Sequence, residues 1–382
     1  MRSVAFITSE YPHPKVKHAA GIGTSIKNLA EALAEKGLAV HVFVYHQDTD
    51  DIINDARVTL HLISSKKFRI AQWFFYRKHI QNHVNKAIVR YQIQIVEAPD
   101  WTGITAFMKF KVPLVIRLHG TDAYFCHLEK RPQKFKNFMF EKLALNGAKG
   151  FIAPTNYAGQ LTAGIFSLRN DTITTIHHGL KMEDFENNAP AVFKRNTILY
   201  IGTIIRKKGV LELAQIFNKV LEVNEEAELV LIGSDAPDIQ IGTGSTYALM
   251  EQHFSEKAKR RVRYLGRVAY NEVQEHIKNA HVCVFPSFAE TLGMVTIESM
   301  ALKKPVVNTN IGWAKELIDD GRNGFLEHPS NFKQYAEKIE MLLKDETLCQ
   351  QMGEAARKKV ELQFDIIKQA QTTLEYYNTI VL

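Results

Sequence analysis

The sequence contains only three cysteines in 382 residues, and none of them belongs to a Cys-x-x-Cys pair. An odd number of isolated thiols (Cys126, Cys283 and Cys349) indicates a reducing cytoplasm and no disulfide framework. No apolar run approaches the ~18–20 residues that a membrane-spanning helix needs. The first residues, MRSVAFITSE, also lack a signal-peptide pattern. We therefore expect a soluble, cytoplasmic protein.

A G-x-G-x-x-G fingerprint is also missing after the first apolar run, where the loop reads G-I-G-T over residues 21–24. This disfavours a dinucleotide-dependent dehydrogenase. The charged fraction of 23% and the hydrophobic fraction of 46% exclude a disordered or low-complexity chain. At roughly 100–200 residues per domain, the length predicts two domains.

Positive charge is concentrated in the first half of the chain. Residues 1–180 carry 23 Lys/Arg and 13 Asp/Glu, a net charge of +10, and the remainder carries 25 and 28, a net charge of −3. Such asymmetry indicates an anionic partner for the first half, such as lipid or nucleic acid.

Short apolar runs alternate with helical patterns along both halves. A helix is predicted over 25–37, where Ile26, Leu29, Ala30 and Leu33 share one face and Gly37 provides a C-cap. A polar segment, 181–195, is typical of an interdomain linker. This order predicts an α/β protein of two doubly wound parallel-sheet domains. The expected strands cover 1–8, 39–45, 93–98, 113–119 and 150–155 in the first half, and 197–202, 227–233, 261–266, 281–286 and 304–309 in the second.

Ligands bind beyond the carboxyl ends of the strands in such sheets, and several expected strand ends carry glycine or polar residues. Examples are His119-Gly120, Gly202 and Pro286-Ser287. Two such domains facing each other would form a cleft that suits a substrate with two halves. We take this cleft as the expected site.

The segment FPSFAETLGMVTIESMA, residues 285–301, contains two glutamates eight positions apart. Gly293 lies between Glu290 and Glu298, and a helix-like stretch begins at Val295, after the strand expected over 281–286. A strand end followed by a helix N-terminus favours phosphate through unpaired N–H groups and the helix dipole. Carboxylates beside a phosphate site more plausibly accept hydrogen bonds from the hydroxyls of a ribose or a sugar. The alternative is a pair of glutamates on a solvated helix face.

This segment resembles the E-x7-E signature of the retaining family 4 glycosyltransferases, whose GT-B fold consists of two facing Rossmann-like domains. Five further stretches resemble the family in the same order along nearly the whole chain. They are AAGIGTSIKNLAEALAEKGLAVHVF from residue 19, RLHGTD from 117, IHHGLKMEDF from 176, YIGTIIRKKGV from 200 and IGWAKELIDDGRNGFL from 311.

The resemblance implies a donor site in the second half. Glu298 would bind the ribose hydroxyls of the donor nucleotide, and Glu290 would contact the donor sugar near the reacting centre. Lys208, which precedes Gly209, would neutralise the departing diphosphate, a charge whose stabilisation is often the largest catalytic term. The diphosphate itself would be held by backbone amides of Thr291, Leu292, Gly293, Met294 and Val295.

The chain departs from the family at Thr203, where an arginine usually follows the glycine of the strand end. Arg206 lies three residues further on, and we expect it to reach the phosphates instead; full activity of an Arg206→Ala variant would refute this. In the first half, Gly21 and Gly23 would let the backbone approach the donor phosphates or the acceptor. Ala20 stands where the family commonly has another glycine, which weakens the case for a phosphate contact there.

His119 matches a family histidine close to the donor sugar, and Asp122 is expected to orient it. The family reaction retains the anomeric configuration and needs no cofactor or metal; the donor is a nucleotide-diphosphate sugar, with a UDP-sugar favoured over a GDP-sugar. Asp48-Thr49-Asp50 superficially resembles the Asp-x-Asp metal site of the other glycosyltransferase fold. Because no donor motif surrounds it, we do not assign it that role.

Residues 64–90 carry seven Lys/Arg and no acidic residue, with aromatic residues interleaved. A helix that is basic on one face and aromatic on another is typical of a membrane interface. Residues 128–142 could extend this patch, and together they predict peripheral association with an anionic membrane. The alternatives are a helix that packs its aromatic residues on the sheet, or an acidic soluble or nucleic-acid partner. No recognised nucleic-acid-binding motif accompanies the charge, so we expect no nucleic acid.

The sequence thus predicts an acceptor-binding domain over 1–180, a donor-binding domain over 190–365 and a C-terminal helix over 366–382 that returns to the first domain. The expected function is transfer of a sugar to a lipid-linked or polysaccharide acceptor at the inner face of the cytoplasmic membrane, in surface glycan biosynthesis. One alternative is the same chemistry on a small soluble acceptor. A non-catalytic nucleotide-sugar-binding protein is another, although such a protein would be expected to lose Lys208 or a glutamate. An epimerase of the same fold has no support in the motif context.

Overall fold

A computed structural model describes residues 1–381 of the chain. The chain divides into two compact units. Unit 1 comprises Met1–Lys181 together with the segment from Asp365 onward, and unit 2 comprises Met182–Phe364. The first boundary falls at the start of the polar segment 181–195.

Unit 1 is built on an eight-stranded sheet of order β3-β4-β2-β1-β5-β6-β7-β8. Neighbouring strands pair in parallel, apart from β3, which runs antiparallel to β4. The sheet confirms the predicted α/β class, although β3, β4 and β8 were not predicted. Its strands are β1 (Ser3–Thr8), β2 (Ala39–Gln47), β3 (Asp51–Asp55), β4 (Val58–Ser64), β5 (Ile95–Pro99), β6 (Leu114–Arg117), β7 (Gly150–Ala153) and β8 (Ile173–Thr175).

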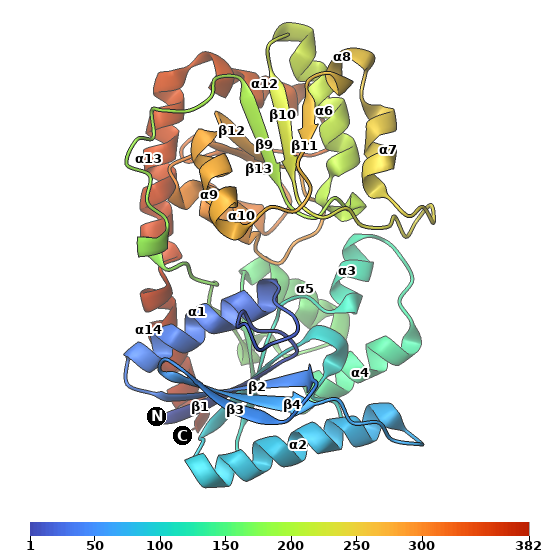
Figure 1. Ribbon diagram of the computed structural model, residues 1–382, viewed down its shortest axis with the longest axis vertical. Coiled ribbons are helices and arrows are strands. Elements are labelled where there is room, and N and C mark those ends of the chain that lie inside the picture. Colours follow the sequence, from blue (N-terminus) through green and yellow to red (C-terminus); the bar gives the residue numbers. More distant parts are fainter. Residues whose placement is uncertain (382) are drawn as a thin grey trace. The chain divides into compact units, whose positions relative to one another are not determined.

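Helices cover both faces of this sheet (Figure 1). Successive residues of β1 face opposite sides: Val4 and Phe6 pack in the core under α1 and α14, whereas Ala5 and Ile7 pack in the core under α2, α4 and α5. The helices are α1 (Gly21–Glu35), α2 (Gln72–Tyr91), α3 (Asp122–Leu128), α4 (Phe135–Asn146), α5 (Asn156–Phe166) and α14 (Ile366–Val381), with short 3₁₀ turns η1 (Trp101–Gly103) and η2 (Asn170–Thr172).

The C-terminal helix α14 is part of unit 1 and lies beside α1 (Figure 1). At its start, Ile366 N donates a hydrogen bond to Leu180 O at 2.9 Å. Further along, the Tyr377 hydroxyl donates to Glu97, which also accepts two hydrogen bonds from Arg117. A buried charge is tolerated when it is paired and hydrogen-bonded, so this network ties α14 to the sheet.

Two local predictions in unit 1 were wrong. The helix expected from residue 25 begins at Gly21, so the glycines expected in a loop form its first turn. The basic and aromatic stretch 64–90 is helical only from Gln72, and residues 65–71 have no regular structure.

Unit 2 contains a six-stranded parallel sheet of order β11-β10-β9-β12-β13-β14. Its strands are β9 (Thr197–Ile201), β10 (Glu228–Ile232), β11 (Val262–Tyr264), β12 (Val282–Phe285), β13 (Val306–Thr309) and β14 (Phe325–Glu327). Its helices are α6 (Val210–Val223), α7 (Thr246–His253), α8 (Glu256–Lys259), α9 (Tyr270–Asn279), α10 (Met294–Ala301), α11 (Ala314–Leu317), α12 (Phe332–Lys344) and α13 (Glu346–Gln363), with 3₁₀ turns η3 (Met182–Asp184) and η4 (Arg206–Lys208). Only β14 among these strands was not predicted.

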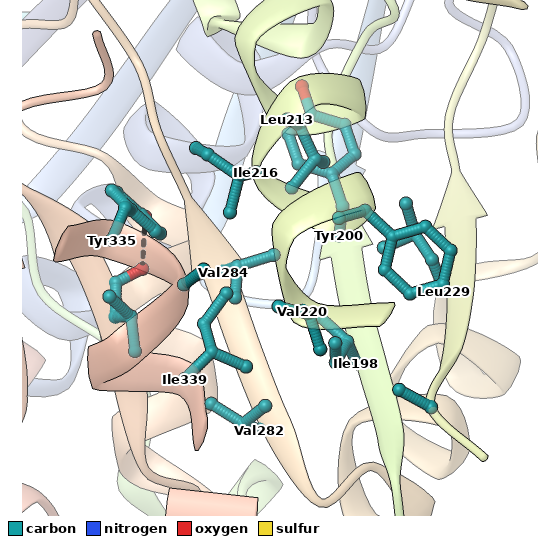
Figure 2. Packing of buried hydrophobic residues seen from close by; sticks show 14 of the residues in the cluster. Ile198, Tyr200, Leu213, Ile216, Val220, Leu229, Val282, Val284, Tyr335 and Ile339 are labelled. Carbon is teal, nitrogen blue, oxygen red and sulfur yellow. Dashed lines mark hydrogen bonds between the residues drawn. The ribbon is translucent and has the colours of Figure 1, made fainter. Parts of the chain in front are cut away.

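The core of unit 2 lies between this sheet and the helices α6 and α12. Figure 2 shows side chains of β9, β10 and β12 packed against Leu213, Ile216 and Val220 of α6 and against Tyr335 and Ile339 of α12. The Tyr335 hydroxyl is satisfied inside this core because it donates to Val307 O at 2.7 Å. This packing fixes the sheet whose carboxyl ends carry the candidate site.

Within residues 1–381, no helix combines the length and the apolar character needed to cross a lipid bilayer.

Candidate functional site

Lys208 and Glu290, predicted from separate motifs, form an ion pair in unit 2. Lys208 ends the 3₁₀ turn η4 that follows β9, and Glu290 lies in the loop that follows β12. The two side chains retain only 22% and 17% of their exposure, so both charges are largely removed from water. A small cavity of about 10 Å³ is lined by both residues, together with Ser287, Gly293 and Thr296.

The two loops are locked together through their backbones. The Phe288 and Ala289 amides donate to Lys207 O at 2.8 and 3.3 Å. Gly209 has φ +69°, and a Cβ atom there would lie 1.8 Å from Pro286 O. Only glycine permits both this conformation and this approach, so Gly209 brings Lys208 next to Glu290.

The segment expected to hold a diphosphate leads into α10. Gly293 is the N-cap, with φ +92°, and Met294 and Val295 are the first two helical residues. Thr291 is half-buried and Leu292 is buried, which fixes the approach to the helix. Unpaired amides in the first turn and the helix dipole make such a terminus attractive to an anion.

Glu298 lies on α10, and the hydroxyl of Tyr270 from α9 donates to it at 3.1 Å. Burial raises the pKa of Glu298 to about 7, although the Tyr270 hydrogen bond acts in the opposite direction. The carboxylate therefore changes charge near neutral pH. No sequence motif points to Tyr270, which lies 28 positions before Glu298 on another helix.

Arg206 is held by a partner that the sequence did not reveal. Its Nε donates to Asp238 Oδ2 at 2.7 Å, and Asp238 is only 1% exposed. Burial acts to raise the pKa of Asp238, but the hydrogen bonds from Arg206 and from the Ile241 and Gln240 amides outweigh it and lower that pKa. Thr203, by contrast, has an exposed side chain, and its carbonyl accepts from the Tyr200 hydroxyl at 3.2 Å.

In unit 1, His119 follows β6 in a loop that is fixed by Asp100. The His119 and Gly120 amides donate to the two carboxylate oxygens of Asp100 at 2.8 and 3.2 Å. Burial, with a contribution from Arg117, lowers the pKa of His119 to about 3, so its ring is neutral. Asp122, which we expected to orient His119, instead accepts hydrogen bonds from Arg131 and Asn137.

His178 is a second histidine at this position of unit 1. Its ring stacks on that of His119, with centroids 4.9 Å apart and planes 11° from parallel. Its Nδ1 is hydrogen-bonded to Ser25 Oγ of α1 at 2.9 Å. The sequence places His178 in the IHHGL stretch, but only the fold brings it to His119.

The two N-terminal glycines differ in their surroundings. A Cβ at Gly23 would lie 2.7 Å from Glu10 O, and its amide donates to Glu10 Oε1 at 2.8 Å. A Cβ at Gly21 would meet nothing within 4 Å. Gly23 is thus required by the packing of α1 on the loop after β1, and its amide already has an acceptor.

Two sequence families together match most of this chain. Residues 19–184 match "Glycosyltransferase Family 4", and residues 181–359 match "Glycosyl transferases group 1". The chain is a family 4 glycosyltransferase. The resemblance inferred from the six sequence stretches is therefore confirmed.

Individual proteins similar to this glycosyltransferase agree with that assignment. The capsular polysaccharide biosynthesis glycosyltransferase CapM of Staphylococcus aureus is 31% identical over 206 residues, which are 52% of this chain and 47% of that protein. The solved sucrose-phosphate synthase of Thermosynechococcus elongatus superposes with a TM-score of 0.80 at 19% identity, over 100% of this chain and 99% of that one. HepE of Anabaena, solved with UDP-glucose, has a TM-score of 0.74 at 17% identity, over 98% and 99%. These structural similarities confirm the GT-B fold.

Proposed function

We propose that this glycosyltransferase transfers a sugar from a UDP-sugar, with retention of configuration, to a lipid-linked or polysaccharide acceptor in surface glycan biosynthesis, such as that of capsule, lipopolysaccharide or exopolysaccharide. The observation that carries the proposal is the Lys208–Glu290 pair, which lies with Gly293, the N-cap of α10, around one small cavity. The capsule-synthesising relative and the UDP-glucose complex of HepE support the acceptor and donor classes.

The donor diphosphate would bind at the N-terminus of α10, where amides of residues 291–295 face it. Lys208 would leave Glu290 for the diphosphate and stabilise the charge that develops as the glycosidic bond breaks. Glu290 would then accept hydrogen bonds from the donor sugar. Glu298, oriented by Tyr270, would accept the ribose hydroxyls.

Transfer needs neither a metal ion nor an enzymic nucleophile in this proposal. The acceptor hydroxyl attacks the anomeric carbon from the face that the diphosphate leaves, and a diphosphate oxygen takes the hydroxyl proton. The products are a retained glycoside and UDP, so the proton and the charge balance. His119, neutral because of its low pKa, would hydrogen-bond the donor sugar without adding charge.

The test of this chemistry is UDP release from UDP-glucose, UDP-galactose and UDP-N-acetylglucosamine, with and without a lipid-linked glycan acceptor. Acceptor-dependent UDP release from one of these donors, unaffected by EDTA, with an anomeric proton signal that matches the donor configuration, is expected. An inverted product, or activity that EDTA abolishes, would refute the proposed mechanism. Binding of UDP without any transfer would favour the non-catalytic alternative.

Membrane association is the second part of the proposal, and it rests on a surface of unit 1. Residues 64–90 and 128–142 meet where Trp73 of α2 contacts Phe140 of α4, with ring centroids 5.1 Å apart, and where Arg77 covers the Phe140 ring at 4.6 Å. Ile70, which precedes α2, and Phe135, the first residue of α4, are 75% and 77% exposed. Exposed aromatic and aliphatic side chains among lysines are typical of a surface that docks on anionic lipid.

The rest of α2 packs in the hydrophobic core, as expected from the alternative that this helix packs on the sheet. Ile80, Val84 and Ile88 are buried against the sheet, so within residues 64–90 the membrane hypothesis is limited to the segment before and at the start of α2. We name this surface the basic-aromatic patch; it comprises residues 66–75 and 130–136.

Liposome flotation tests the basic-aromatic patch. Binding to vesicles that contain anionic lipid, its loss on adding salt and its loss in an Ile70→Ser/Phe135→Ser double variant are expected. The matched control is Val192→Ser/Ile239→Ser, which changes two exposed residues of unit 2 and should leave vesicle binding unchanged. Wild-type protein that stays with the soluble fraction would point to a small soluble acceptor, whose phosphate this charge would then bind.

A further inference from the structure

Helix α2 presents two histidines one turn apart at the edge of unit 1. His79 and His83 have ring centroids 4.6 Å apart in an edge-to-face arrangement. Residues at i and i+4 lie on the same face of a helix, and this spacing allows two imidazoles to bind one metal ion. Neither histidine belongs to a motif that the glycosyltransferase assignment uses.

Asp50 completes a group of three from the loop between β2 and β3. One ligand atom from each of Asp50, His79 and His83 lies within 4.8 Å of the other two. Asp50 Oδ2 is 3.8 Å from His83 Nε2, and Asp50 Oδ1 accepts from the Ser64 amide at 2.7 Å. That amide fixes the orientation of the carboxylate, as outer hydrogen bonds commonly do for metal ligands.

His79 provides an independent indication that a ligand is expected here. Its Nε2 is shielded from solvent and has no hydrogen-bond partner among residues 1–381. An unpaired buried nitrogen is costly, and coordination of a cation would satisfy it.

The chemistry of the three groups selects the ion. Two imidazoles and one carboxylate suit zinc and other divalent transition metals, whereas Mg²⁺ and Ca²⁺ prefer oxygen ligands alone. Tetrahedral coordination at ~2.0–2.1 Å places ligand atoms roughly 3.4 Å apart. Side-chain movements of about 1 Å would therefore bring the three ligand atoms to coordination distance of one ion. A groove of about 380 Å³, lined by Asp50 and His83 among others, gives an ion access from solvent.

We propose that Asp50, His79 and His83 bind one divalent transition-metal ion, with zinc as the best match, and that this ion ties the β2–β3 loop to α2. The fourth position would hold water. The site is distinct from the donor site, which lies in unit 2, and it takes no part in sugar transfer. It therefore does not alter the expectation of metal-independent catalysis.

Cobalt and zinc titrations of untagged, EDTA-treated protein test this site directly. One equivalent of Co²⁺ should produce the visible absorption bands of four-coordinate cobalt, and Zn²⁺ should displace them and raise the melting temperature. His79→Gln, His83→Gln and Asp50→Asn should each weaken binding by roughly tenfold or more. His127→Gln, which removes an exposed histidine of α3, should bind as the wild type does.

The proposal is overturned if wild-type protein gives neither the bands nor a thermal shift at a ~100-fold excess of metal. It is also overturned if the three variants bind as tightly as His127→Gln. Asp50 is exposed, so Asp50→Asn is expected to fold even if a histidine variant does not, and circular dichroism checks each fold. UDP-release activity should persist in all four variants, which separates this inference from the proposed function.

Discussion

Replacing Lys208 by methionine removes the charge that we expect to act on the leaving diphosphate. Methionine keeps most of the length and volume of the side chain, so packing around η4 is preserved. The substitution removes the positive charge beside Glu290, of whose side chain only 17% is exposed. Two effects are therefore expected, one on catalysis and one on stability.

The catalytic effect should be the larger. Loss of one preorganised group that stabilises developing charge lowers kcat by about 10²–10³-fold, equivalent to about 2.7–4 kcal/mol. The stability effect lies between that of an exposed pair, about 0–1 kcal/mol, and that of a fully buried one, about 3–5 kcal/mol, because both partners are largely but not completely buried. We expect about 1–3 kcal/mol, a decrease in melting temperature of several degrees.

A double variant separates the two effects. Lys208→Met/Glu290→Gln removes both charges, so it should recover much of the lost stability but none of the lost activity. Lys219→Met, which removes an exposed lysine of α6, is the charge-matched control and should leave kcat unchanged. UDP release measures kcat, and urea unfolding measures stability. A Lys208→Met enzyme within threefold of wild-type kcat would refute the role of Lys208.

Gly209→Ala should destabilise the protein by about 2–4 kcal/mol in urea unfolding, because the new Cβ would lie 1.8 Å from Pro286 O at a φ of +69°. Gly21→Ala is the control and should be neutral or slightly stabilising, because a Cβ there would meet nothing within 4 Å. Equal effects of the two substitutions would contradict this. UDP affinity should rise with pH through about 7 as Glu298 ionises, and Glu298→Gln should flatten this dependence in calorimetric titrations. Because burial raises the pKa of Glu298 above its unfolded value of 4.5, the free energy of unfolding should decrease as the pH rises from 4.5 to 7. If Glu298→Gln leaves this pH dependence unchanged, the raised pKa does not belong to Glu298. Asp100→Ala should lower the free energy of unfolding by about 1–3 kcal/mol and should also lower kcat, because the His119 and Gly120 amides lose their acceptor. Full activity of this variant would contradict a role of Asp100 in positioning His119.

Most of the fold could be predicted from the sequence because its parallel strands are buried on both faces. The runs at β1, β2, β9, β10 and β12 are mostly apolar and almost entirely buried, and turn residues bound them. The strands that were missed are short or lie toward a sheet edge, such as β3 and β14, where polar residues interrupt the pattern. The early start of α1 was missed because glycine has a low helix propensity, which packing on Glu10 overrides.

The site residues also fall into two groups, those in sequence motifs and those that only folding brings to the site. Lys208, Glu290 and Glu298 lie in local sequence motifs, so the sequence alone singles them out as candidate site residues. Asp238, the partner of Arg206, and Tyr270, the partner of Glu298, lie in no recognisable motif, because only folding brings each of them to its partner. Asp100 and His178 escaped notice for the same reason: the contacts that join them to His119 span 19 and 59 positions of sequence.

Thermal unfolding in the presence of UDP, GDP, ADP and NAD tests the central claim, a donor site for a UDP-sugar, most directly. A ligand at ~100 times its dissociation constant stabilises the native state by about 2.7 kcal/mol. We expect a shift of several degrees with UDP, a smaller one with GDP or ADP, none with NAD, and loss of the UDP shift in Glu298→Ala. Protection by NAD alone, or a UDP shift that Glu298→Ala leaves intact, would contradict it.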